Sequence, residues 1–224
     1  SLRLTAGLLL FGMAFLWGCS RSGALSGEIT TRTPSGDLVR GARTNLYLVV
    51  SSEAFEREWA ALVAAFRVEV GPALEWQRTA RLRADEARFA WDRALAARGT
   101  PAGQRGRWTL TLRDASAAGS PQLWRNARGA EAEAFQAQRR IWEITRTHEE
   151  FAHTLVEKHA IQRVQTDETG RYVIVKAPIG PAYLYARLRE KDANAIWFKP
   201  VQVQAGTQWI DLTRENQREW SLTP

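Results

Sequence analysis

The chain has 224 residues, of which 45% are hydrophobic and 25% charged, and its formal net charge is +7. This balance excludes an intrinsically disordered chain, and the length is sufficient for one sizeable core or two small ones. Because Cys19 is the single cysteine, an internal disulfide is excluded as well.

Residues 4–18 form an apolar segment without charged side chains that follows Arg3. Such a run behind a basic residue resembles a bacterial export signal. Its end, from Leu16 to Cys19 (LWGC), further resembles a lipoprotein box, which implies that Cys19 is a candidate for lipidation after cleavage. Two alternatives stay open: an uncleaved anchor that contacts membrane lipid through residues 4–18, and a helix buried in a globular core.

The signal or anchor helix is therefore predicted over residues 1–18, and a tether that contains glycine and serine follows over 19–26. Arg3 ahead of the apolar segment favours a cytoplasmic N-terminus. We then expect a membrane-anchored chain with its bulk in the periplasm or on the outer side of the inner membrane.

The first β-rich part contains two runs separated by turn residues. Residues 28–33 alternate and are rich in threonine, and Pro34 to Asp37 supply a turn through the preset φ of proline and a permissive glycine. Residues 44–50 form a strong β run. We expect these two strands to form a hairpin.

The hydrophobic period then changes from two to 3.6, which indicates helices. Ser51 or Ser52 stands at the N-cap position, Gly71-Pro72 is expected to break the first helix, and Gly99 is expected to cap a second helix over 73–98. The apolar positions are Phe55, Trp59, Leu62, Val63, Phe66 and Val70 in the first helix and Trp76, Ala80, Ala84, Ala87, Trp91 and Leu95 in the second.

Residues 99–129 are irregular, with a short strand predicted at 108–112, and a long helix is predicted from Ala130 to about Gln162. This helix would reach about 45–50 Å, which a small sandwich alone cannot cover. We therefore expect an antiparallel helical hairpin that projects from the β part, and a compact separate helical domain is the alternative. The predicted apolar stripe of the long helix is Phe135, Ile141, Trp142, Ile144, Phe151, Ala152, Leu155 and Val156.

The second β-rich part begins with an acidic, glycine-containing turn at 167–170 and the run from Tyr172 to Val175. After Pro178 to Pro181, alternate residues from Ala182 to Leu188 share one face, which predicts a hairpin with one buried side. The opposite face carries Tyr183, Tyr185 and Arg187.

Two final strands are expected at 195–203 and 207–212, around a turn at Gly206, before a polar tail that begins at Asn216. The central expectation is a core in which Leu46 and Leu48 meet the interior shared by Val173 and Leu184.

These β-rich parts resemble the carboxypeptidase-regulatory-like, transthyretin-type β-sandwich over about residues 26–51 and 164–214. The residues that carry the resemblance are Ser26-Gly27-Glu28-Ile29, Pro34-Ser35-Gly36, Gly41-Ala42-Arg43 with Leu46, Leu48 and Val50, Thr166-Asp167-Glu168-Thr169-Gly170-Arg171-Tyr172, and Pro178-Ile179-Gly180-Pro181-Ala182-Tyr183. The resemblance implies a sandwich formed by 27–51 and 164–214, interrupted by a helical insertion over 52–163 and followed by a tail over 215–224.

The expected fold class is thus α+β: a small antiparallel β-sandwich with a long helical-hairpin insertion and an N-terminal membrane-anchor helix. The transthyretin-type fold also includes hydrolases of a purine-breakdown intermediate. Their His and Arg constellation and their C-terminal Tyr-Arg-Gly-Ser ending are missing from this chain, and no zinc-peptidase domain is attached.

The sequence offers few residues for catalysis or metal binding. His148 and His153 are five residues apart, about 140° around a helix, so they cannot converge on a metal as i,i+4 ligands do. Glu149 and His153 share a face, which is typical of a surface pair. The sequence shows no nucleophile elbow and no phosphate loop, so we predict no catalytic residues, no metal, no cofactor and no enzymatic activity.

Positive charge is concentrated in the insertion. Between Gly71 and Arg128, eleven arginines stand against five acidic residues, a local balance of 11 − 5 = +6. Arginine suits anionic lipid head groups or an acidic protein partner, and an ordinary solvated helix face is the alternative. The export segment argues against nucleic acid as a partner.

We expect a non-catalytic, membrane-anchored accessory or scaffold subunit of a bacterial envelope or membrane protein complex, with other envelope or membrane proteins as partners. Its helical insertion would carry the contact surface. The candidate contact residues are Trp76, Arg81, Arg88, Trp91, Trp108, Trp124 and Arg125. The alternative is a periplasmic or surface lipoprotein module that binds glycan on exposed aromatic rings, with Tyr183, Tyr185 and Trp197 as the platform.

Overall fold

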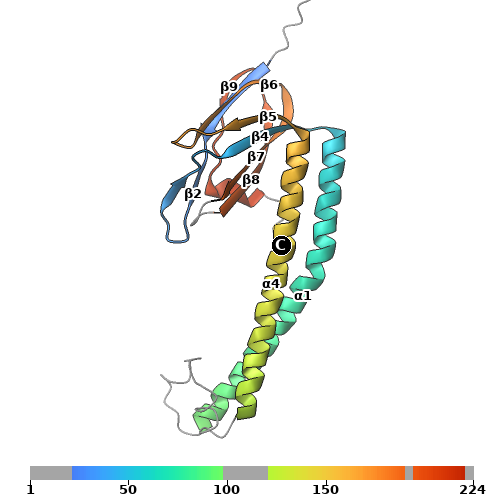
Figure 1. Cartoon of the computed structure of the whole chain (residues 1–224), viewed down its shortest axis with the longest axis vertical. Coiled ribbons are helices and arrows are strands. Elements are labelled where there is room, and N and C mark those ends of the chain that lie inside the picture. The colour runs from blue at the N-terminus through green and yellow to red at the C-terminus, as the bar shows by residue number, and fades with distance from the viewer. Residues whose placement is uncertain (1–21, 98–120, 190–193, 220–224) are drawn as a thin grey trace, which may run out of the picture.

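The computed structural model describes residues 22–97, 121–189 and 194–219. It has the α+β architecture expected from the sequence, with β-sheets at one end and a long helical hairpin (Figure 1). Within the described ranges, no helix combines the length and apolar character that a membrane crossing requires. The predicted anchor over 1–18 and Cys19 lie outside the described residues.

Nine strands form the β part over the residues that the structure describes. They are β1 (Ser22–Glu28), β2 (Thr30–Arg32), β3 (Leu38–Arg40), β4 (Asn45–Val50), β5 (Ala160–Gln165), β6 (Arg171–Pro178), β7 (Gly180–Arg189), β8 (Asn194–Val203) and β9 (Gly206–Trp209). One sheet has the order β6-β1-β9, a second has the order β5-β4-β7-β8, and β2 and β3 pair with each other. The three glycines at 36, 170 and 206 have positive φ, as the turns there require.

The strand pairing corrects three expectations from the sequence. The turn at 34–37 is confirmed, but it joins β2 to β3. The hairpin expected between residues 28–33 and 44–50 does not form, because β4 pairs with β5 and β7 instead. The β6 and β7 strands lie in different sheets, so the chain crosses between layers at Gly180 in place of the predicted hairpin. The β9 strand runs parallel to β1, so the β part is not purely antiparallel.

The two sheets enclose a core that joins both β-rich parts of the sequence. Leu46, Leu48 and Leu184 are fully buried in one cluster, as predicted. Val173 is 59% exposed, however, and its neighbours Tyr172 and Ile174 face the core instead. Because side chains alternate along a strand, this one-residue difference in register exchanges the two faces of β6.

The helical hairpin consists of α1 (Glu53–Ala97) and α4 (Pro121–His159). Ser52 is the N-cap of α1, since its hydroxyl accepts a hydrogen bond from the amide of Phe55 at 3.3 Å. The predicted break at Gly71-Pro72 is wrong, because α1 continues through Pro72. Burial of Val70 and Ala73 on either side of the proline holds the helix on its partner, and α1 is bent in Figure 1, as proline in a helix favours.

The boundaries of α4 also differ from the prediction. It begins at Pro121, where proline is favoured as the first helical residue, and not near Ala130. It ends at His159, and residues 160–165 form β5, which pairs with β4. The predicted strand at 108–112 and the predicted cap Gly99 lie outside the described residues.

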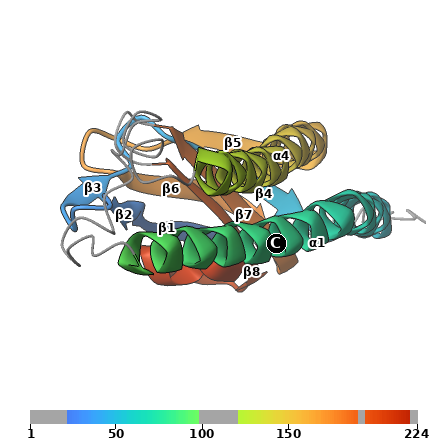
Figure 2. The same cartoon turned by 90° about the horizontal axis from the view of Figure 1, so that it is seen from below.

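Only part of the apolar stripe predicted for the long helix is buried in the contact between α1 and α4, which we call the seam. Ile141, Ile144, Ala152 and Val156 are buried, in agreement with the prediction. Phe135, Trp142 and Phe151 are exposed by 70%, 57% and 56%. The seam is lined instead by the small Ala137 and by His148, which allow the helices to pack closely at steps of three and four residues. In Figure 2, seen from below, the two helices lie side by side.

The near half of the hairpin covers the outer face of the β5-β4-β7-β8 sheet. The ring of Phe198 on β8 stacks between Trp59 of α1, at 4.1 Å, and Tyr183 of β7, at 4.7 Å between centroids. The hydroxyl of Tyr183 also donates to Glu56 of α1 at 2.6 Å. Both faces of β7 are therefore buried, not one side as predicted: Leu184 faces the sandwich and Tyr185 faces the helices.

The chain returns to the sandwich at its end. Leu212 is fully buried, and the indole of Trp197 donates to the carbonyl of Thr213 at 2.8 Å. The first residues of the tail predicted over 215–224 belong instead to the 3-10 helix η1 (Arg214–Glu219). The side-chain amide of Asn216 donates to the carbonyl of Asp211 at 2.8 Å, which fixes this last turn against the sheet.

Candidate functional site

The first candidate site is the far half of the hairpin, where the sequence placed its contact residues. Two of them connect the helices. The indole of Trp76 (38% exposed) donates to Glu133 of α4 at 3.3 Å, and Arg81 donates to Gln138 of α4 at 3.3 Å. These side chains stabilise the hairpin, and their exposed parts lie on its surface.

The remaining predicted contact residues have different surroundings. Trp91 is only 3% exposed and packs with the third core cluster, so its ring is not available to a partner. Trp124 is partly buried against that cluster, and Arg125 donates to Gln122 of its own helix at 2.9 Å. Arg88 is exposed on α1. Trp108, like Cys19, lies outside the described residues.

The hairpin also exposes an apolar row on α1 that the sequence analysis missed. Val68, Leu82 and Phe89 are 74%, 58% and 66% exposed. They are spaced by fourteen and seven residues, so on a straight helix they lie within about 60° of one another around the axis. On α4, Phe135 and Trp142 are likewise seven residues apart and exposed. The heptad spacing is the feature of the sequence that could have indicated these rows. Phe135 and Trp142 were predicted to be buried because they are apolar.

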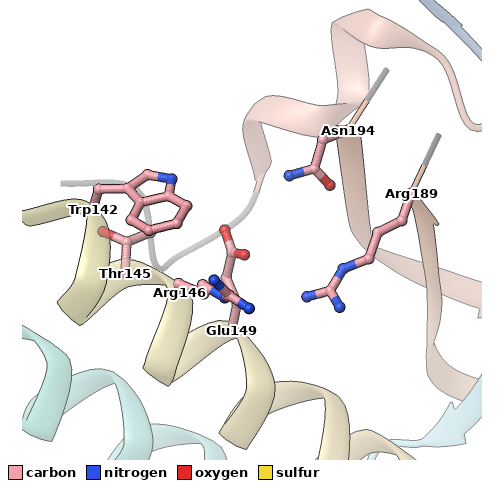
Figure 3. A pocket seen from close by; sticks show the side chains of 6 residues that line it. All are labelled: Trp142, Thr145, Arg146, Glu149, Arg189 and Asn194. Atoms are coloured by element: carbon pink, nitrogen blue, oxygen red, sulfur yellow. The ribbon is translucent and has the colours of Figure 1, made fainter. Parts of the chain in front are cut away.

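The second candidate site is a polar groove between α4 and one end of the β5-β4-β7-β8 sheet (Figure 3). It consists of two pockets of about 310 and 330 Å³ that share Arg189. The first is lined by Trp142, Thr145, Arg146, Glu149, Arg189 and Asn194. The second is lined by Asn45, Tyr47, Glu150, His153, Arg187 and Arg189.

Figure 3 shows how the first pocket is built. Glu149 projects from α4, while Arg189 and Asn194 point toward the helix from the ends of β7 and β8. Trp142 lies two turns before Glu149 on α4 and is 57% exposed. The guanidinium of Arg146 lies 5.4 Å from the centre of the Trp142 ring, a cation–π contact.

An ion-pair network forms the floor of the groove. Arg187 has only 7% of its side chain exposed and donates to both carboxylate oxygens of Glu150, at 2.8 and 2.9 Å. Arg189 bonds the same carboxylate. Because two guanidinium groups hold one carboxylate, the network fixes the position of Arg189 at the junction of the two pockets.

Burial changes the protonation of two groups in the groove. Desolvation raises the pKa of Glu149, and the charge of Arg187 opposes that shift. Desolvation likewise lowers the pKa of His153, whose ring packs against Tyr47 and Tyr185 with centroids 5.7 Å away in each case. Both shifts favour the neutral form, which is the usual effect of removing an ionisable group from water.

The three histidines have separate environments. His148 is buried in the hairpin against Phe66, His153 lies in the groove, and His159 is 3.3 Å from Glu58 of α1. In the described ranges, no group of three or more His, Cys, Asp or Glu side chains is arranged to hold a metal ion.

The aromatic platform predicted for glycan binding is wrong as a set. Tyr185 and Trp197 are fully buried, and Tyr183 is partly buried beneath α1. The helices cover the outer face of β7, which the sequence pattern had assigned to solvent, and this buries Tyr185 and part of Tyr183. Trp197 of β8 faces the other way, into the core between the sheets. Residues of the groove come from four elements, so no local pattern in the sequence could have indicated it.

Comparison with known proteins gives only distant likenesses. No protein-family model matches the chain, and no curated protein matches it. A "putative carbohydrate binding protein" from Pseudomonas aeruginosa is 14% identical, with a TM-score of 0.36, over 87% of this chain and 90% of that one. The pilus backbone protein of Streptococcus pneumoniae is 10% identical, with a TM-score of 0.26, over 81% of this chain and 35% of that one.

At these TM-scores, the solved structures carry no argument about the function of this chain. The expected transthyretin-type fold is not confirmed by them, and the established description is the coarser one: an α+β protein with packed β-sheets and a helical hairpin.

Proposed function

We propose that the protein is a non-catalytic, membrane-anchored accessory or scaffold subunit of a bacterial envelope complex, and that its helical hairpin binds the partner. The observation that carries the proposal is the exposed apolar row Val68, Leu82 and Phe89 on α1. Isolated exposed apolar side chains are ordinary on protein surfaces, but a row at heptad spacing on a long helix is typical of helix–helix contacts.

The geometry supports a docking role for the hairpin. At about 1.5 Å per residue, the 45 residues of α1 extend over about 68 Å, and Figure 1 shows the far half of the hairpin beyond the sheets. The sandwich supplies a rigid base, because the near half of the hairpin is fixed to it by Trp59, Phe198 and the Tyr183–Glu56 hydrogen bond. A rigid sandwich and a long exposed hairpin are the features expected of a spacer, which would hold a partner at a fixed distance from the sandwich.

The occupant that fits the row is an amphipathic helix of a partner protein. Its apolar stripe would pack along Val68, Leu82 and Phe89, and acidic residues beside that stripe would meet arginines of α1. Arg78 and Arg93 lie four residues from Leu82 and Phe89, within reach of such a neighbour. The predicted anchor and Cys19 would place this contact outside the inner membrane.

Affinity purification of the full chain from native membranes tests this proposal. The wild-type chain should co-purify with one or a few discrete envelope proteins. The double variant Leu82→Ser, Phe89→Ser should lose them, since the row contributes most of the apolar contact. The matched control is Val173→Ser, which removes an apolar side chain that is 59% exposed on the sandwich. Equal recovery of partners with both variants would contradict the proposal.

A further inference from the structure

We propose that the polar groove between α4 and the sheet binds a short, uncharged linear saccharide. The inference concerns a different surface from the apolar row of α1 and does not depend on the scaffold role. Its basis is the composition of the groove: one exposed indole at one end, planar amide, carboxylate and guanidinium groups along the walls, and nearly balanced charge.

The size of the groove fits a chain of rings. Each pocket lies at the lower end of the range of about 300–1,000 Å³ that small-molecule sites occupy. The stretch of α4 from Trp142 to His153 spans about 16 Å along the helix axis. Because Arg189 borders both pockets, an extended ligand could contact all of this length, whereas a compact ligand would fill one pocket only.

The polar groups of the groove match hydroxyls. Asn45 and Asn194 can each donate and accept hydrogen bonds, Glu149 accepts and Arg189 donates. A hydroxyl is also both a donor and an acceptor, so a polyhydroxylated ring can satisfy such a mixed set in several places. The indole of Trp142, 57% exposed, offers an apolar surface to the C–H face of a ring.

The charges of the groove disfavour phosphates and other strongly anionic ligands. Three arginines line it, but Glu149 and Glu150 stand beside them, and Arg187 and Arg189 are both bonded to Glu150. An anion that binds Arg187 or Arg189 would have to displace that carboxylate or lie next to it, which costs electrostatic free energy. A neutral ligand meets no such barrier.

Ligand-observed NMR on the full chain tests the inference with three trisaccharides: maltotriose, cellotriose and triacetylchitotriose. At least one should bind with a dissociation constant of roughly 1 mM, as expected for an open groove with few apolar contacts. Trp142→Ala and Arg189→Gln should each weaken that binding about tenfold, the value of one good contact of about 1.4 kcal/mol.

The control variant is Phe135→Ala, because Phe135 is 70% exposed on the same helix and does not line the groove. Phe135→Ala should bind the trisaccharide with the affinity of the wild type. The double variant Leu82→Ser, Phe89→Ser should do so as well, so that loss of partner binding and loss of saccharide binding are distinguishable. Absence of binding by all three trisaccharides would overturn the inference. So would binding that Trp142→Ala leaves unchanged, or stronger binding of citrate than of any of the sugars.

Discussion

The indole of Trp59 lies parallel to the ring of Phe198, with an interplanar angle of 13° and 4.1 Å between centroids. Trp59 belongs to α1 and Phe198 to β8, so this stack joins the hairpin to the sheet. Phe55 adds a second contact to Phe198 from the preceding turn of α1, at 6.2 Å. The orientation of the hairpin therefore depends on a small aromatic cluster at its base.

Trp59→Ala should destabilise the fold strongly. Trp59 is only 8% exposed, and removal of a buried tryptophan costs about 3–5 kcal/mol because it leaves a cavity and loses the transfer free energy. The free energy of unfolding from urea titrations followed by circular dichroism measures the effect. The control Phe89→Ala removes a ring that is 66% exposed and should change that free energy by about 0.5 kcal/mol or less. Equal effects of the two variants would contradict this packing.

Gly27→Ala should be among the most damaging small changes in the sandwich. A Cβ at Gly27 would lie 1.9 Å from the carbonyl oxygen of Ile210, and the amide of Ile210 is bonded to Ser26 at 2.7 Å. Relief of that clash requires separation of the β1 backbone from the segment that follows β9, so we expect a loss above about 3 kcal/mol.

Gly129→Ala is the matched control for Gly27→Ala. A Cβ at Gly129 in α4 would meet no atom within 4 Å. Because glycine is a poor helix former, this variant should raise the free energy of unfolding by about 0.5–1 kcal/mol. A Gly27→Ala protein as stable as the wild type would show that β1 and the segment around Ile210 are not in contact.

Arg187→Met should destabilise the protein by roughly 2 kcal/mol, since it removes the bidentate pair with Glu150 and leaves that carboxylate with Arg189 alone. The value is below that of a fully buried pair because the Glu150 side chain is 44% exposed. Arg189→Met, at a position whose side chain is 51% exposed, should cost less than about 1 kcal/mol. Thermal or urea unfolding of the two variants measures these losses of stability. A larger loss for Arg189→Met than for Arg187→Met would contradict the proposed role of Arg187 in the network.

The stability of the protein should depend on pH through His153. Burial lowers the pKa of His153 in the folded state below the ordinary value of 6.5, so the unfolded chain takes up a proton first as the pH falls. This contribution to stability is complete above pH 6.5 and is lost as the pH falls through the lowered pKa. The groups that face His153 are Glu157, Arg187, Glu150 and Arg163.

An NMR titration of the histidine ring protons, with His153→Gln as the assignment control, measures this shift. The His153 midpoint should lie below 6.5, and His153→Gln should reduce the loss of stability between pH 7 and pH 5. A midpoint above 6.5 would show that the charge of Glu157 outweighs burial.

Two patterns in the sequence predicted their secondary-structure elements correctly. The run 44–50 predicted a strand correctly because it is rich in β-forming residues, although both faces of β4 are buried. The helix was predicted correctly because its apolar positions have a period of 3.6 and share one buried face: Phe55, Trp59, Val63, Phe66 and Val70. The prediction was wrong at Val173 because the run from Tyr172 to Val175 is apolar at every position, so nothing in it distinguishes the two faces.

The break predicted at Pro72 is wrong for a different reason. Local propensity disfavours proline inside a helix, but the packing of the two long helices on each other outweighs this cost of about 3 kcal/mol. The groove could not be predicted at all, because Asn45, Trp142, Arg189 and Asn194 are distant in sequence and meet only through the arrangement of α4 on the sheet.

Site-specific photo-crosslinking in native membranes tests the role of the hairpin most directly. A photoreactive residue is placed at position 82 or 89 on the apolar row of α1, or at position 173 or 175 on the sandwich, where valines are 59% and 61% exposed. We predict that positions 82 and 89 crosslink to the same discrete envelope protein and that positions 173 and 175 do not. Crosslinks to that protein from the sandwich alone, with none from the hairpin, would contradict the account.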